Sequence, residues 1–163
     1  MKNLLKKGFT LIELLIVISI IGILTAIVTT NLVAARARAR DARRKGDLEA
    51  ISQSLRLYYT DYQHFPTSSN GVIIGCGSSG NTPCPWDTDF SNDSSTTYMG
   101  HLPLDPSSST TIISYKYISA GGDTFALVAT LENISDGDIL DSHARCLTVY
   151  PSPADNEYVV CAE

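Results

Sequence analysis

The arrangement best suited to chemistry is a carboxylate placed inside an apolar run. Residues 9–28 are almost entirely apolar, yet they contain Glu13. A charge at such a depth in a membrane costs roughly 2.5–3.5 kcal/mol on insertion scales, so an ionisable group there indicates a function. The simplest partner is another buried charge, and cleavage after Gly8 would create one as an α-amino group on Phe9. Glu13 is therefore a candidate functional residue, and the amine on Phe9 would be its partner if the chain is cut after Gly8.

A second candidate site is a group of carboxylates near the C-terminal end of the chain. Asp136, Asp138 and Asp141 lie within six residues, in a segment expected to join two strands. Calcium binds several hard oxygen ligands from a flexible loop, so these three side chains are candidate Ca²⁺ ligands. Their spacing is not that of an EF-hand, and solvated turn acids are the alternative interpretation.

The four cysteines all lie in the C-terminal hundred residues. An even count in a small domain behind an apolar segment indicates two disulfides and an oxidising compartment. We expect the pairs Cys76–Cys84 and Cys146–Cys161. The second pair follows from an expected hairpin of strands 146–150 and 157–161, whose antiparallel register places the two cysteines opposite each other. The spacings disfavour zinc because no C-x-x-C pair is present.

No arrangement of residues typical of catalysis appears in the sequence. The three histidines are scattered, and no nucleophile motif surrounds any of the serines. We therefore predict a protein that is not an enzyme, and a tethered enzyme is the rival class. The arginine cluster between residues 36 and 45 lacks interleaved aromatic residues, so we infer no specific nucleic acid partner.

One long helix is expected to present the N-terminal groups. Twenty helical residues span about 30 Å, so residues 9–35 are expected to cross a membrane or to form a filament core. Residues 36–65 continue the helix as an amphipathic segment, because their apolar positions recur at steps of three and four. Pro66 ends it, since the residue before a proline disfavours helical backbone. The apolar stripe consists of Leu48, Ile51, Leu55, Tyr58, Tyr59 and Tyr62.

Residues 66–163 are expected to form a globular head. Residues 67–110 are rich in Ser, Thr, Asn, Gly and Pro, which predicts a long loop, anchored by Trp86, Phe90 and Tyr98. Residues 111–161 are expected to form an antiparallel sheet, beginning with strands 111–119 and 124–132 and a turn between them. The predicted fold class is α+β, with a long N-terminal helix packed by its C-terminal half on a small antiparallel sheet.

Charge divides the chain into two parts. Residues 1–60 hold ten of the twelve Lys and Arg residues and four acids, whereas residues 61–163 hold two basic residues and thirteen acids. This split predicts two environments. The basic arm is expected to lie against the acidic heads of other copies, against anionic lipid head groups, or against both in turn.

The segment Lys6-Lys7-Gly8-Phe9-Thr10-Leu11-Ile12-Glu13 resembles the processing site of the type IV pilin and type II secretion pseudopilin superfamily. The resemblance implies a pilin-like fold and a leader, residues 1–8, that a prepilin peptidase removes before N-methylation of Phe9. It implies that Glu13 then guides each subunit into register with its neighbour's N-terminus. Residues 102–106, Leu-Pro-Leu-Asp-Pro, are similar to the segment that leads into the sheet of major pseudopilins, which also bind calcium in this region.

The function implied by the resemblance is structural. We expect a single-pass inner-membrane subunit, with its head outside the cytoplasm, that leaves membrane lipid to join a helical homopolymer of itself. An inner-membrane assembly platform and its ATPase are the implied partners, and the filament is a type IV pilus serving adhesion, motility or DNA uptake. The alternative is the major pseudopilin of a type II secretion system, in a periplasmic pseudopilus. A plain signal anchor, or a secreted soluble binding domain cleaved near residues 33–35, are further alternatives.

Overall fold

The structure is a computed structural model that describes residues 8–92, 96–107 and 115–162, with backbone only for residues 27–31. The chain forms two compact units, Met1–Ala37 and Arg38–Glu163. The predicted leader, apart from Gly8, and residues 111–114 of the predicted strand 111–119 lie outside the described residues.

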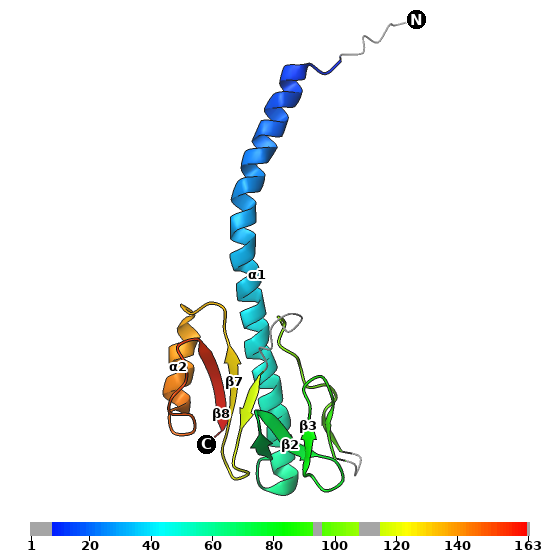
Figure 1. The fold of residues 1–163 in the computed structure, drawn as a ribbon, viewed down its shortest axis with the longest axis vertical. Helices are drawn as coiled ribbons and strands as arrows, with labels where there is room; N and C mark the ends of the chain where they lie inside the picture. Colours follow the sequence, from blue (N-terminus) through cyan, green and yellow to red (C-terminus); the bar gives the residue numbers. More distant parts are fainter. Residues whose placement is uncertain (1–7, 93–95, 108–114, 163) are drawn as a thin grey trace, which may run out of the picture. The chain divides into compact units, whose positions relative to one another are not determined.

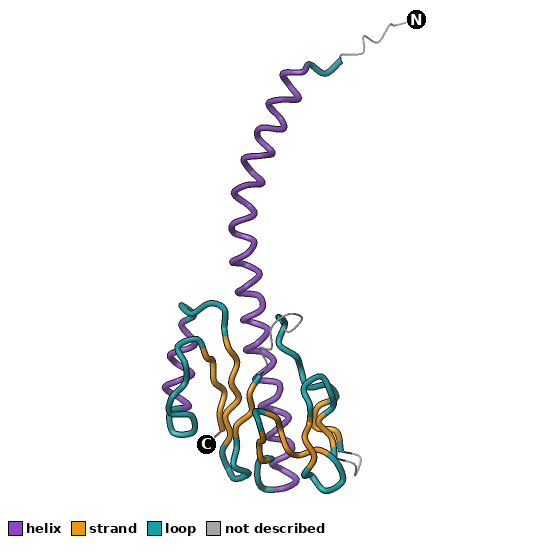
Figure 2. The backbone as a smooth tube through the Cα atoms, in the orientation of Figure 1, coloured by secondary structure: helices purple, strands orange, loops and turns teal. Residues whose placement is uncertain are grey.

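Helix α1, Leu11–Tyr62, is a single helix of 52 residues and confirms the predicted long helix (Figures 1 and 2). Gln63 follows it with φ of 58°, a left-handed conformation that turns the chain out of the helix. The Gln63 N–H donates to the Tyr59 carbonyl at 2.8 Å, which closes the last turn. The helix therefore ends at Tyr62, four residues before Pro66 and three residues short of the predicted boundary at residue 65.

No helix within the described part of the chain has an apolar stretch that meets the length and hydropathy needed to cross a membrane. The membrane-spanning role of residues 9–35 stays a prediction.

The centre of the second unit is a three-stranded antiparallel sheet. Its strands are β6 (Lys116–Ile118), β7 (Phe125–Thr130) and β8 (Glu157–Ala162), in the order β6-β7-β8. Helix α1 covers one face through its apolar stripe, whose Leu48, Ile51 and Leu55 are fully buried. The turn between β6 and β7 and the strand predicted at 124–132 are confirmed.

A second helix covers the opposite face of this sheet. Helix α2, Gly137–Cys146, buries Ile139, Ser142 and Cys146, and the sheet therefore lies between two helices (Figure 1). The predicted strand at 146–150 is wrong, because α2 and a turn occupy that part of the chain. The side chain of Asp136 accepts a hydrogen bond from the Asp138 N–H at 3.0 Å and caps α2.

The prediction of a loop over residues 67–110 is wrong in part, because five short strands lie there. Strands β1 (Thr67–Ser69), β2 (Val72–Cys76) and β3 (Thr82–Cys84) form one sheet, and β4 (Phe90–Ser91) pairs with β5 (Thr97–Met99). Asn70 and Gly71 both have positive φ, the geometry of a tight hairpin turn.

The predicted anchors of this region are confirmed. Phe90 is fully buried, Tyr98 is buried, and Trp86 packs against the same core. Aromatic rings therefore attach the short strands to the rest of the second unit.

Both predicted disulfides are present. Cys76–Cys84 joins β2 to β3, and Cys146–Cys161 joins the end of α2 to β8. The second pairing is correct, but its predicted reason is wrong, since a helix rather than a strand carries Cys146. That bridge fixes α2 to the edge strand of the central sheet.

Replacing Cys146 and Cys161 with serine should lower the free energy of unfolding by about 3 kcal/mol, the chain-entropy value for a loop of this length. The bridge closes a sequence separation of 15 residues. Guanidinium unfolding of the full chain in detergent measures the effect, with Ser152→Ala in the exposed loop before β8 as the control. An unchanged unfolding midpoint in the double variant would contradict the stabilising role of the bridge.

Candidate assembly site

The predicted processing residues lie just ahead of α1. Gly8 and Phe9 are outside the helix and exposed, Phe9 by 83%. Both residues that flank the predicted cleavage bond are therefore exposed in the single chain.

Glu13 caps its own helix together with Thr10. The backbone N–H and the hydroxyl of Thr10 donate to Glu13 Oε2 at 2.9 and 2.7 Å, and the Glu13 N–H donates to Thr10 Oγ1 at 3.3 Å. This reciprocal pattern is a capping box, which satisfies donors that a helix start otherwise leaves unpaired. The ion pair predicted between Glu13 and a neighbour's Phe9 amine requires a second, processed copy and stays a prediction.

The first turns of α1 leave all their large apolar side chains uncovered. Exposure runs from 46% at Val17 to 81% at Leu11 for the large apolar residues between positions 11 and 24. The hydroxyls of Ser19 and Thr25 donate to carbonyls of their own helix, both at 2.8 Å. The helix surface therefore needs apolar partners on every side, and an exposed apolar surface of this extent marks an interaction site.

Within the second unit, a buried guanidinium holds the C-terminal half of α1 to the rest of the unit. Arg44 is 0% exposed, and its Nε and Nη2 donate to the two Asp105 carboxylate oxygens at 2.7 and 3.0 Å. Its Nη1 donates to Asp41 at 2.6 Å and to Glu132 at 2.9 Å. Three carboxylates from three segments of the chain therefore neutralise one buried cation, and the bidentate pair fixes its orientation.

Asp41 extends this network to the backbone after β7. Its two oxygens accept the N–H groups of Glu132 and Asn133, each at 2.9 Å. Asp105 lies in the Leu-Pro-Leu-Asp-Pro segment, so the part of this segment that touches α1 is its aspartate. The network connects α1, the segment before β6 and the turn after β7.

The expectation that the basic arm serves other copies or lipid is wrong for three of its residues. Arg44 is buried, Arg40 pairs with Glu132 at 2.5 Å, and Lys45 pairs with Asp136 and Asp138, both at 2.7 Å. These carboxylates belong to the same chain. Arg38 and Arg43 stay exposed on α1.

The three predicted calcium ligands do not converge. Asp136 and Asp138 both pair with the Lys45 ammonium, and Asp136 also caps α2. Asp141 is exposed one turn later on α2. No group of three or more His, Cys, Asp or Glu side chains able to hold a metal occurs among the residues that the structure describes.

The cluster lowers the pKa values of two of its carboxyl groups, Glu132 and Asp105. The Arg40 hydrogen bond, helped by Arg44, lowers the pKa of Glu132 to about 2. Burial opposes ionisation of Asp105, but hydrogen bonds from Arg44 and Ser107 outweigh it and hold the pKa of Asp105 below its ordinary value. Both groups are therefore charged in the folded chain well into the acidic range.

Comparison with known proteins agrees with the N-terminal geometry. The family model described as "Prokaryotic N-terminal methylation motif" matches residues 4–29, which include Gly8, Phe9 and Glu13. The type II secretion system core protein G of Pseudomonas aeruginosa is 30% identical over 118 residues, which cover 71% of this chain and 75% of that protein. The chain belongs to the type IV pilin and type II secretion pseudopilin superfamily.

Two further relatives are similar to this chain over about half of their own length. Type II secretion system core protein G of Escherichia coli is 36% identical over 67 residues, 41% of this chain and 46% of that protein. Type IV wide pilus major component PilA4 of Thermus thermophilus is 45% identical over 71 residues, 44% of this chain and 53% of that protein. The chain thus spans about half the length of these two relatives. No solved structure matches it.

The buried cluster should make the stability of this superfamily member depend on pH. Because the folded pKa of Glu132 lies near 2, below its ordinary value of 4.5, its stabilising effect is complete above about pH 4.5. That effect is lost as the pH falls from 4.5 towards 2. We expect the thermal unfolding midpoint to fall over this window, and less steeply in Glu132→Gln. An equal slope in both proteins would contradict this assignment.

Proposed function

We propose that the chain is a structural subunit of a type IV pilus-like filament, assembled through its N-terminal helix and serving adhesion, motility or DNA uptake. The observation that carries the proposal is the uncovered apolar surface of α1 from Leu11 to Leu24, directly after the methylation motif. Copies of this helix packed side by side would bury one another's apolar surface. The head, Arg38–Glu163, would stay outside this packed core.

Processing and location follow from the same proposal. A prepilin peptidase cuts between Gly8 and Phe9, which is then N-methylated, and membrane lipid holds the apolar helix before assembly. An inner-membrane platform and its ATPase then move the subunit from the membrane into the filament, with the head outside the cytoplasm.

The major pseudopilin of a type II secretion system is the second candidate. The match to core protein G of Pseudomonas aeruginosa favours it, because that match extends beyond the N-terminal helix and covers 71% of this chain. The filament would then be a short periplasmic pseudopilus rather than a surface pilus.

Mass spectrometry of the mature N-terminus, in membrane and sheared-surface fractions, tests both candidates. We expect a chain that begins at methylated Phe9 in both fractions if it is a pilus subunit. Methylated Phe9 in membranes alone would favour the pseudopilus. A chain that begins near Arg36 would contradict assembly through the apolar helix altogether.

Glu13→Ala should leave cleavage after Gly8 intact but reduce assembled filament about tenfold or more. A neighbour's α-amino group would then be buried among apolar helices without its counter-charge, and 1.4 kcal/mol of lost affinity already equals a factor of ten. Ser19→Ala is the matched control, because the Ser19 hydroxyl bonds only its own helix. Filament yield is measured by shearing and immunoblotting. Wild-type yield from Glu13→Ala would refute the ion pair.

A further inference from the structure

The outer face of α2 carries an apolar ridge that nothing in its own chain covers. The α2 ridge consists of Leu140, Ala144 and Leu147, spaced so that they lie on one side of the helix. Leu140 is 74% exposed and Leu147 is 58% exposed. The opposite side of α2 already packs on β8 through its buried residues, so the ridge is a second apolar face on a short helix.

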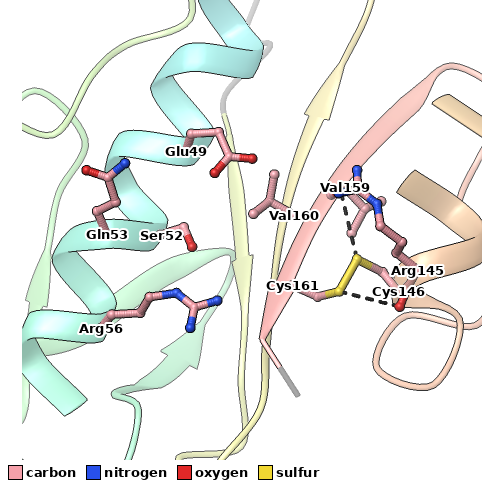
Figure 3. A pocket seen from close by; sticks show the side chains of 9 residues that line it. All are labelled: Glu49, Ser52, Gln53, Arg56, Arg145, Cys146, Val159, Val160 and Cys161. Atoms are coloured by element: carbon pink, nitrogen blue, oxygen red, sulfur yellow. Dashed lines mark hydrogen bonds between the residues drawn. A yellow bond between two sulfur atoms is a disulfide. The ribbon is translucent and has the colours of Figure 1, made fainter. Parts of the chain in front are cut away.

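A matching surface lies on α1, on the side away from its buried stripe. The α1 shelf consists of Gln53, Arg56 and Leu57, and Leu57 is 55% exposed. Arg56 makes no hydrogen bond or ion pair with any other residue in the described part of the chain. Its guanidinium points into a cavity of about 230 Å³ that Cys161 also lines (Figure 3).

The two surfaces carry complementary charges. The carboxylate of Asp141, adjacent to Leu140, likewise has no hydrogen bond or ion pair within the described residues, and it is exposed. Each surface therefore combines an exposed leucine with a neighbouring charge that forms no ion pair within the described residues, and the two charges have opposite sign. Within one copy the two charges form no ion pair, and the Arg56 guanidinium points into the cavity beside Cys146 and Cys161.

The direction of the helices agrees with a contact between parallel copies. Lys45 meets Asp138 near the start of α2, and Arg56 lines the same cavity as Cys146 at its end, so α2 runs in the same direction as α1 (Figure 1). Consecutive residues of a helix are rotated by about 100° around its axis. Asp141 is the residue after Leu140, whereas Arg56 is the residue before Leu57, so the two charges are rotated from their leucines in opposite senses. When two parallel helices face each other through these leucines, the two charges fall on the same side of the contact.

We propose that the α2 ridge of one copy docks on the α1 shelf of the next copy, with Leu140 against Leu57 and Asp141 paired to Arg56. The ridge and the shelf are different surfaces, so the contact is head-to-tail and repeats into an open helical polymer. This inference rests on the proposed filament function, and it names the contact between heads that accompanies burial of the N-terminal helices.

Charge reversal in the full-length chain tests the contact. Asp141→Arg and Arg56→Asp should each reduce sheared filament about tenfold, because each places like charges together in the contact. The double variant restores opposite charges and should recover at least half of the wild-type yield. Asp89→Arg is the matched control, since it makes the same charge change at an exposed residue away from both surfaces and should assemble as wild type.

Four outcomes would overturn the contact. Wild-type yield from either single variant refutes this pairing. So does a double variant that fails to recover, provided that both single variants fold with unchanged thermal midpoints. Both outcomes leave the proposed function standing. Absence of filaments from the wild-type chain refutes both. A loss in Asp89→Arg equal to that in Asp141→Arg would show a general charge effect and would also overturn the specific contact.

Discussion

The head depends on a single buried cation. Arg44 has no exposed surface, and an uncompensated charge in that position would cost several kcal/mol. Asp105, Asp41 and Glu132 supply the compensation from three separate segments. Because each of them must reach the same guanidinium, the network fixes where the segment before β6 and the turn after β7 meet α1, and hence where the central sheet can lie. Apolar packing stabilises this arrangement, whereas the ion network determines which segments lie next to α1.

The two halves of the long helix have different surroundings. In its C-terminal half, Leu48, Ile51 and Leu55 pack on the chain's own sheet, and the other side is polar apart from Leu57. In its N-terminal half the apolar side chains lack such a partner within the described chain, and polar hydroxyls turn back to the helix backbone. The chain can thus complete the packing of one half alone and needs other molecules for the second. This division makes the N-terminal half an assembly element.

The sequence predicts those parts of the fold that depend on short-range patterns of residues. The long helix α1, its apolar stripe and the hairpin before β7 follow from spacing or residue type, whereas the Cys146–Cys161 pair was predicted from a strand that is in fact a helix. The strand predicted at 146–150 failed because Asp136 is a helix cap and Ile139, Ser142 and Cys146 have helical spacing, a signal that the acidic residues obscured. The Arg44 network was missed because its members lie 61 and 88 residues apart, although Asp41 and Arg44 at i,i+3 hinted at it.

The second helix explains how a small head can be stable and can also present a contact surface for neighbouring copies. Strand β7 is buried on both faces, so the sheet needs a cover opposite α1, and α2 provides it with the Cys146–Cys161 bridge. A helix that covers a sheet needs only one apolar side for that purpose. Leu140 and Leu147 on the outer side add nothing to this cover and expose apolar area to water. Exposing these two leucines to water is unfavourable in free energy, and burial between two copies would remove that exposure. The residues that α2 does not need for folding are therefore the ones that argue for contact between heads.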